Sequence, residues 1–122
     1  MSGYVKLVAL LRKRPGMPLE EFRTYYETTH CKLIRLLPGV QRYFRRYLDP
    51  IPPGDTEDQP FHVMTELWFK SRGDFELAMQ RNSSPDVAAI LAEDEAKLFD
   101  RDAARLFTVE ECYSNLSADP QR

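Results

Sequence analysis

Two side chains in this sequence have the chemical types that proton transfer requires. His30 ends the aromatic-rich stretch "FRTYYETTH" and, at about 100° per residue, lies at the edge of the inward face of a predicted helix. Asp94 lies in the middle of an apolar helical stripe, where an ionised carboxylate is costly unless a partner satisfies it. A carboxylate that orients an imidazole is a general acid–base arrangement. We therefore predict His30 as the catalytic acid–base and Asp94 as its orienting group.

Both residues also have a structural explanation, and the sequence leaves it open. A half-buried histidine can simply be hydrogen-bonded to backbone groups, and Asp94 can be satisfied by a strand arginine. Cys31 adjoins His30, but neighbouring side chains on a helix diverge, so a Cys–His nucleophile pair is not expected. The acidic run around Asp94 contains no His or Cys, and no metal site is predicted.

Several side chains could form the wall of a substrate pocket beside these two. Aromatic residues on the inner face of the first helix would supply apolar surface and a phenol hydroxyl. On a predicted strand at 61–69, polar residues alternate with apolar ones. The polar face of this strand could line the interface of a dimer instead of a pocket. The predicted substrate-binding residues are Phe22, Tyr26, His62, Glu66 and Trp68.

The elements that must position these residues follow from hydrophobic periodicity. Strands are predicted at 4–12, 40–48, 61–69 and 105–111, and helices at 19–37, from 71 onwards and at 85–99. This order predicts an α+β, ferredoxin-like βαββαβ fold: a four-stranded antiparallel sheet with helices on one face. The strand at 4–12 is apolar on both faces, so a second copy packed sheet to sheet would cover the side without helices. We therefore expect a homodimer.

Length and composition limit the other possibilities. The 122 residues are 43% hydrophobic and 30% charged, which fits one domain at 1–111 followed by a polar tail at 112–122. A net charge of −2 gives no case for a nucleic-acid or membrane partner. No apolar stretch is long enough to span a bilayer, and two widely separated cysteines favour the cytoplasm. The proline-rich segment 49–60 is predicted to be a mobile loop and a possible lid.

Four stretches together resemble the EthD domain family of dimeric α+β barrels: "VKLVALLRKRPGMPLEEFRTYYETTH", "LPGVQRY", "MTELWF" and "DEAKLFDRDAARLFTVEE". The resemblance covers nearly the whole chain. The family's histidine corresponds to His30, and its Asp-Glu pair corresponds to Asp94 and Glu95. Where the family often has proline, two residues after the histidine, this sequence has Lys32, so an unbroken helix is expected here.

The resemblance implies a small-molecule enzyme, since fungal relatives are implicated in polyketide tailoring as dehydratases or similar. Cousins with this barrel include cofactor-free monooxygenases, lactone isomerases and haem-degrading enzymes. The leading hypothesis is a cofactor-independent enzyme that dehydrates, isomerises or cyclises a hydrophobic aromatic or polyketide-like metabolite. The alternatives are a non-catalytic auxiliary protein that binds a metabolite or partner enzyme, and a cofactor-free monooxygenase. A closed cavity with convergent polar groups would favour catalysis, and a filled core would favour the auxiliary role.

Overall fold

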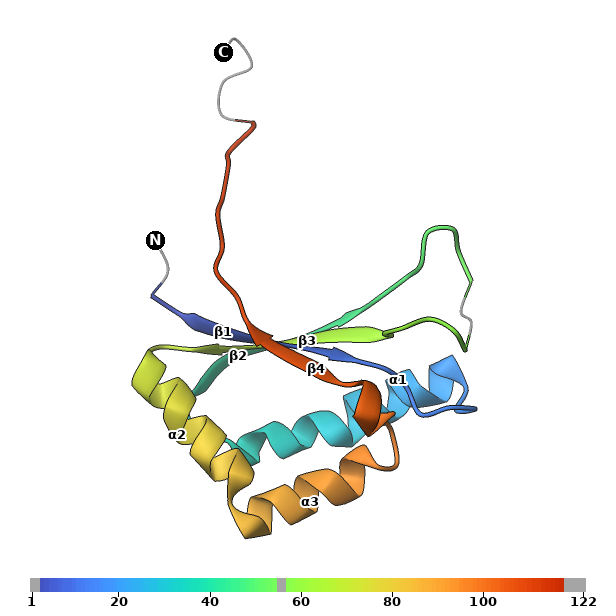
Figure 1. Ribbon diagram of the computed structural model, residues 1–122, viewed down its shortest axis with the longest axis horizontal. Coiled ribbons are helices and arrows are strands. Elements are labelled where there is room, and N and C mark those ends of the chain that lie inside the picture. The colour runs from blue at the N-terminus through green and yellow to red at the C-terminus, as the bar shows by residue number, and fades with distance from the viewer. Residues whose placement is uncertain (1–2, 55–56, 118–122) are drawn as a thin grey trace.

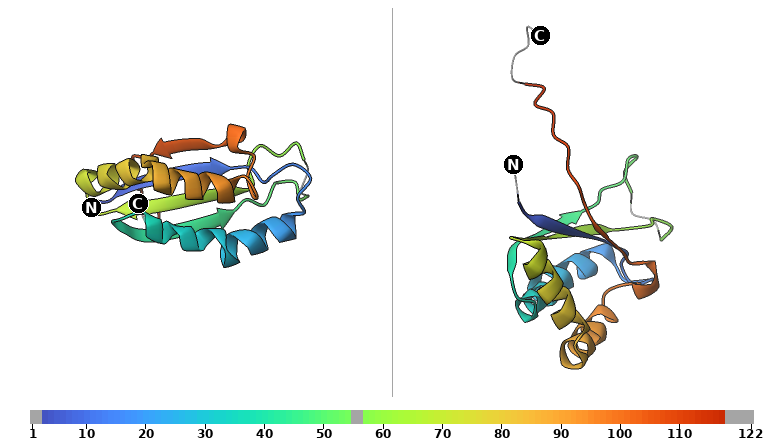
Figure 2. Two further views of the ribbon diagram at one scale, coloured as in Figure 1. Left: turned by 90° about the horizontal axis from the view of Figure 1, so that it is seen from below. Right: turned by 60° about the vertical axis from the view of Figure 1, so that its left-hand side comes forward.

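A computed structural model describes residues 3–54 and 57–117 of the chain. Its four strands form one antiparallel sheet in the spatial order β2-β3-β1-β4, and the helices lie together on one face of it (Figures 1 and 2). The strands are β1 Val5–Leu11, β2 Val40–Tyr47, β3 Val63–Phe69 and β4 Arg105–Thr108. The helices are α1 Leu19–Thr28, α2 Arg72–Ser83 and α3 Pro85–Glu95, with 3₁₀ segments η1 His30–Leu36 and η2 Arg101–Ala103. The predicted ferredoxin-like βαββαβ fold is confirmed.

Strand register decides which side chains face the helices. In the central pair, Leu7 lies opposite Leu67 and Ala9 lies opposite Thr65, and these residues point toward the helical layer. The intervening residues of each strand point to the other face, which no helix covers in the described part of the chain (Figure 1). We call this second side the open face. In residues 3–54 and 57–117, no helix is long and apolar enough to cross a membrane.

The expected unbroken helix from 19 to 37 is wrong. Helix α1 ends at Thr28, and Thr29 leaves helical geometry with φ −125° and ψ −63° before η1 begins at His30. Two consecutive β-branched residues disfavour helix propagation, and the Thr28 hydroxyl donates to the Thr24 carbonyl at 2.7 Å. The break starts a new turn at the histidine, so its direction no longer follows the phase of α1.

Two other element boundaries differ from the prediction. Strand β3 begins at Val63 rather than at 61, so His62 lies outside the ladder and does not share a face with the residues that alternate after it. Helix α3 ends at Glu95 rather than at 99. The turn that follows it buries Leu98 completely, and the Leu98 carbonyl accepts a hydrogen bond from the backbone N–H of Arg14 at 2.8 Å.

The loop between β2 and β3 is held by charge. The aliphatic side chain of Ile51 in this loop is 98% exposed. Glu57 instead accepts a hydrogen bond from the Gly16 N–H at 2.7 Å and pairs with Lys13, while Arg12 donates to the Glu57 carbonyl. These contacts fix the described part of the loop to the turn after β1. None of its described residues lines the cavity presented below, so this structure gives no support for a lid.

Candidate active site

A cavity of about 490 Å³ lies between the sheet and the helical layer. Its volume is in the range of small-molecule sites. Asn82 of α2, Glu95 of α3, and Arg101 and Asp102 of η2 form its polar part nearest the helix ends. Most of the remaining wall is aliphatic, drawn from β1, η1, α2 and β4, and includes Leu7, Leu33, Ile34, Leu37, Met79 and Leu106.

His30 reaches this cavity from the first residue of η1. Its ring stands edge-on to two aromatic rings, Tyr26 at 5.2 Å and Phe99 at 5.3 Å between centroids. Its Nδ1 lies 2.7 Å from Oδ2 of Asp94, and the two side chains are only 11% and 14% exposed. Contacts on three sides therefore fix the orientation of the imidazole. The contact between His30 and Asp94, suggested by helical phase alone, is present.

The second oxygen of Asp94 is also occupied. The Tyr25 hydroxyl donates to Oδ1 at 2.5 Å, and this hydrogen bond is the main reason that the pKa of Tyr25 is raised to about 12. Burial acts to raise the pKa of the Asp94 carboxyl, but the hydrogen bonds from Tyr25 and His30 outweigh it and leave that pKa below its ordinary value. An ionised Asp94 requires a proton on Nδ1 of His30. Nε2 is then the nitrogen available to a molecule in the cavity.

The last turn of α1 is fixed to the sheet just before the histidine. Glu27 receives hydrogen bonds from Arg45 Nη2 at 2.7 Å and Arg45 Nε at 3.1 Å, and a third from the Tyr47 hydroxyl at 2.5 Å. These donors lower the pKa of Glu27 despite partial burial, with the Arg45 hydrogen bonds as the largest cause. The two donors lie on the helix-facing side of β2. This clamp holds the last turn of α1 against β2, close to His30.

A chain of hydroxyl groups runs along the sheet side of the cavity. Tyr26 and Thr65 share a hydrogen bond of 2.6 Å, and Tyr43 donates to the Tyr26 hydroxyl at 3.3 Å. Burial is the main reason that the pKa values of Tyr26 and Tyr43 are raised, so both phenols remain neutral at physiological pH. All three residues line the cavity. Neutral hydroxyls in an apolar enclosure can bind a carbonyl or enolate oxygen by hydrogen bonding.

Of the five predicted substrate contacts, only Tyr26 lines the cavity. Phe22 is fully buried one layer away, packed against Tyr26 and Phe99. His62 is 2% exposed at the end of the sheet, where its Nδ1 accepts the backbone N–H of Lys13 at 3.1 Å.

Glu66 and Trp68 lie on the open face, where the indole Nε1 of Trp68 donates to Glu66 at 2.5 Å. Glu66 is also paired with Arg46 at 2.9 Å. The sheet separates both residues from the cavity. Neither residue can therefore contact a molecule bound in this cavity. Their position on the open face suits a role at an interface instead.

Four residues of the site were not predicted: Tyr25, Tyr43, Thr65 and Phe99. One of them carried a usable signal. Thr65 stands between Val63 and Leu67 on the helix-facing side of β3, and a hydroxyl on an otherwise apolar face indicates a polar partner. Tyr25 gave no such signal, because it is about 100° round the helix from Tyr26 and periodicity assigns it to the surface. Its partner Asp94 is 69 residues away in sequence.

The described residues contain no group of three or more His, Cys, Asp or Glu side chains placed to hold a metal ion. Both cysteines are free thiols: Cys31 is half-buried, and Cys112 is exposed. The site is therefore described by the imidazole, the carboxylate and the hydroxyl groups around one apolar cavity.

Comparison with known proteins gives a family and a set of similar folds. The EthD domain profile matches residues 14–102. An EthD family protein from Bacillus halodurans superimposes with a TM-score of 0.63 at 24% identity, covering 89% of this chain and 99% of that one. No curated protein is similar enough in sequence to count as a relative.

Two further solved structures share the fold at lower identity. A dimeric protein of unknown function with a ferredoxin-like fold from Bacteroides fragilis has a TM-score of 0.56 and 17% identity, covering 90% of this chain and 98% of that one. A point mutant of SnoaB, a cofactor-independent oxygenase from Streptomyces nogalater, has a TM-score of 0.55 and 14% identity, covering 95% of this chain and 99% of that one. At these identities the likeness concerns the fold alone.

Proposed function

The chain belongs to the EthD domain family, and from this premise we propose that it is a cofactor-independent enzyme that transfers protons within a hydrophobic, aromatic or polyketide-like metabolite. The observation that carries the proposal is the hydrogen bond between His30 and Asp94 beside an apolar cavity. A buried imidazole held in one tautomer is suited to removing a proton from a carbon next to a carbonyl group. A filled core would have favoured a purely auxiliary role.

The proposed step uses two groups of this chain. Nε2 of His30 accepts the proton from carbon, and the electron pair moves onto the neighbouring carbonyl oxygen of the substrate. The Tyr43 hydroxyl turns from Tyr26 to donate to that oxygen, which is feasible because its present hydrogen bond is long at 3.3 Å. The imidazolium, stabilised by Asp94, then returns the proton to a different carbon in an isomerisation or to a departing hydroxyl in a dehydration.

Hydrogen exchange tests this step without knowledge of the final product. Purified protein is incubated in D₂O with a panel of aromatic and polyketide-like ketones, and deuterium incorporation next to the carbonyl is followed by mass spectrometry. We expect His30→Gln to slow incorporation by ~10²-fold or more while the far-ultraviolet circular dichroism is unchanged. Lys32→Gln, two residues along on an exposed side chain, is the matched control. Equal exchange by wild type and His30→Gln would contradict the proposal.

A cofactor-free monooxygenase is the second candidate. This candidate is supported by the similar fold of SnoaB, which is described as a cofactor-independent oxygenase. The same proton removal would produce a carbanion able to react with molecular oxygen. Oxygen consumption that depends on substrate and on His30 would favour this candidate over isomerisation or dehydration. Ligand binding without exchange, turnover or oxygen uptake would instead favour the auxiliary role.

We further propose that the protein acts as a homodimer, with two open faces packed together. The fold neighbour from Bacteroides fragilis is described as dimeric. Phe107, which lies opposite Val8 in the sheet, is 51% exposed, and Trp68 is half-buried, on a face that no described helix covers. A stable interface should bury more than ~1,200 Å². A monomer in sedimentation at micromolar concentration would contradict this arrangement.

A further inference from the structure

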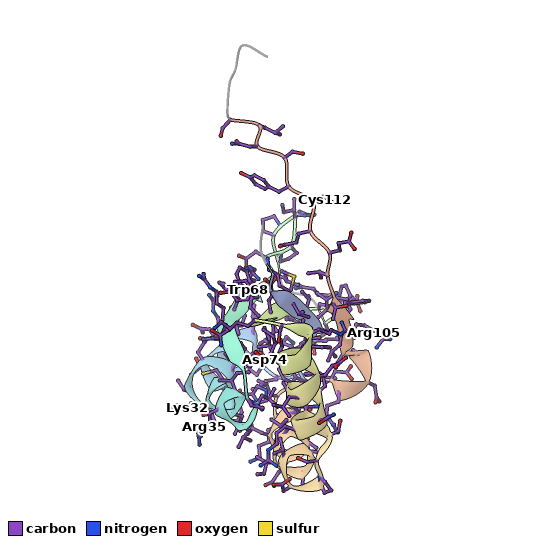
Figure 3. The ribbon with its side chains drawn as sticks, turned by 90° about the vertical axis from the view of Figure 1, so that its left-hand side faces the viewer. Lys32, Arg35, Trp68, Asp74, Arg105 and Cys112 are labelled. Carbon is purple, nitrogen blue, oxygen red and sulfur yellow. The ribbon has the colours of Figure 1, made fainter. Side chains whose placement is uncertain are left out.

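The segment after β4 leaves the body of the molecule. Its last contacts with its own sheet are a hydrogen bond from the Val109 N–H to the Lys6 carbonyl at 3.2 Å and an ion pair between Lys6 and Glu111. Beyond that point it continues as extended chain on the side of the sheet opposite the helices (Figure 1). Figure 3 shows Cys112 standing clear of the domain on that side. We call residues 109–117 the C-terminal arm.

The C-terminal arm exposes apolar side chains that its own chain does not cover. Tyr113 is 87% exposed, Leu116 is 91% exposed and Val109 is 41% exposed. Single exposed apolar residues are ordinary on a surface. A run of them on an extended segment with few contacts to its own domain is less common, because such a segment has little reason to hold its shape alone.

The open face lies on the same side as the C-terminal arm, as the label of Trp68 in Figure 3 shows. Trp68 is the centre of an aromatic patch, with ring centroids 5.1 Å from Tyr4 and 5.5 Å from Phe44. Arginines surround the patch: Arg42 lies over the Trp68 ring at 5.1 Å, and Arg46 lies over the Phe44 ring at 4.5 Å. The surface is therefore aromatic at its centre, next to the Arg46–Glu66 ion pair, and carries the positive charge of Arg42 along β2.

We propose that the C-terminal arm of each copy lies along the second copy in the homodimer, with Tyr113 and Leu116 packed on the partner. The inference rests on the homodimer proposed above and adds the segment that holds it together. Strands lie ~4.8 Å apart, so a four-stranded sheet is about 14 Å across. Extended chain advances by roughly 3.3 Å per residue, so the six residues of the arm beyond Glu111 reach about 20 Å, enough to cross a partner sheet.

Charge favours the same occupant. After Val109 the arm carries Glu110, which is exposed, and Glu111, which is paired with Lys6 of its own chain. On a facing copy the Glu110 carboxylate would approach the arginines of β2, including Arg42, whose side chain is exposed. The apolar residues of the arm follow these acids in sequence, so an arm that starts at the charged margin would bring Tyr113 over apolar surface.

Photo-crosslinking tests the arm directly. Tyr113 is replaced by p-benzoylphenylalanine in the full chain, and the irradiated protein is run on a denaturing gel. We expect a dimer-sized product in which mass spectrometry joins residue 113 to a peptide of β1, β2 or β3, and mixed isotope-labelled copies should identify the link as intermolecular. The matched control is the same replacement at Leu77 of α2, which is 53% exposed on the helical side and should give no dimer product.

Truncation after Glu111 provides a second measurement. Removal of residues 112–122 should raise the dimer dissociation constant at least tenfold while circular dichroism stays unchanged. Two results would contradict the proposed position of the arm without contradicting the homodimer. One is a protein that sediments as a dimer but yields only monomer-sized product at residue 113. The other is a truncation that leaves the dissociation constant unchanged. A full chain that sediments as a monomer would overturn both the arm and the homodimer, and the enzymatic proposal would be unaffected.

Discussion

Removing one hydroxyl, in Tyr25→Phe, tests whether Tyr25 positions the candidate catalytic pair. The lost hydrogen bond ends on a carboxylate, and such bonds contribute ~1.5–3 kcal/mol. Tyr25 is half-buried and water can replace part of the interaction, so we expect the free energy of unfolding to fall by about 1 kcal/mol at pH 7. Because Asp94 would then be held by His30 alone, deuterium incorporation should also slow by roughly tenfold, within the range typical of misplaced catalytic groups.

Tyr47→Phe is the matched control for this change. Its hydroxyl also donates to a carboxylate at 2.5 Å, that of Glu27, away from Asp94, and the two hydrogen bonds from Arg45 still hold Glu27 when the Tyr47 hydroxyl is removed. Urea unfolding should give a similar loss of about 1 kcal/mol, and exchange activity should stay near wild type. The comparison separates a loss of stability from a loss of positioning, because the two variants remove the same chemical group.

The pH dependence gives the sign of the effect. The pKa of Asp94 lies below its ordinary value of 3.8. The ionised Asp94 carboxylate therefore stabilises the folded protein above that pH, and this contribution is lost as the pH falls through the folded-state pKa. The difference between wild type and Tyr25→Phe should therefore shrink between pH 7 and pH 3. It should also shrink in an Asp94→Asn background, where the acceptor is neutral. An unchanged difference in both experiments, or no effect on exchange, would refute the positioning role.

Three other predictions follow from the hydrogen bonds. The two histidines should be opposite tautomers in ¹⁵N NMR spectra, with His30 protonated on Nδ1 and His62 on Nε2, and matching tautomers would contradict the geometry. The lowered pKa of Glu27 means that its stabilising effect is lost as the pH falls below its ordinary value of 4.5, so Glu27→Gln should flatten the acid side of the stability profile measured by urea unfolding. Glu57→Gln should speed hydrogen exchange at the Gly16 amide with turnover unchanged, and slower turnover would restore a functional role for the loop.

The fold could be predicted because its strands carry clear alternation. β1, β2 and β4 were located to within a few residues, and the charged and apolar faces of β3 were assigned correctly from Val63 onwards. The error at His62 came from extending alternation beyond the end of β3: its backbone is still hydrogen-bonded to Leu11 and Leu48, but its imidazole accepts the Lys13 N–H and packs beside Phe22. The end of α1 was missed because a Thr-Thr pair is a weak helix breaker and only its local hydrogen bonds decide the outcome.

The candidate site was predictable in its centre but not in its surroundings. Helical phase placed His30 and Asp94 on elements that must cover the same side of the sheet, and the two side chains do meet, although His30 reaches Asp94 from η1 and not in the phase of α1. Phase could not supply Tyr25, since a residue at the side of one helix reaches Asp94 only when the angle between α1 and α3 is known. The anchoring of Glu57 was missed for a related reason: counting apolar residues in a loop takes no account of a carboxylate that finds a backbone N–H.

The groups that orient His30 and part of the cavity wall come from different elements, and this bears on how the specificity of the protein could change. The groups that orient His30 come from α1, α3 and the turn after α3, whereas part of the aliphatic wall comes from α2 and β4, with residues such as Met79 and Leu106. Substitutions in that wall can alter the shape of the accepted molecule without moving the imidazole. Selection or engineering can therefore diversify specificity in one set of elements while the reactive group is kept in another.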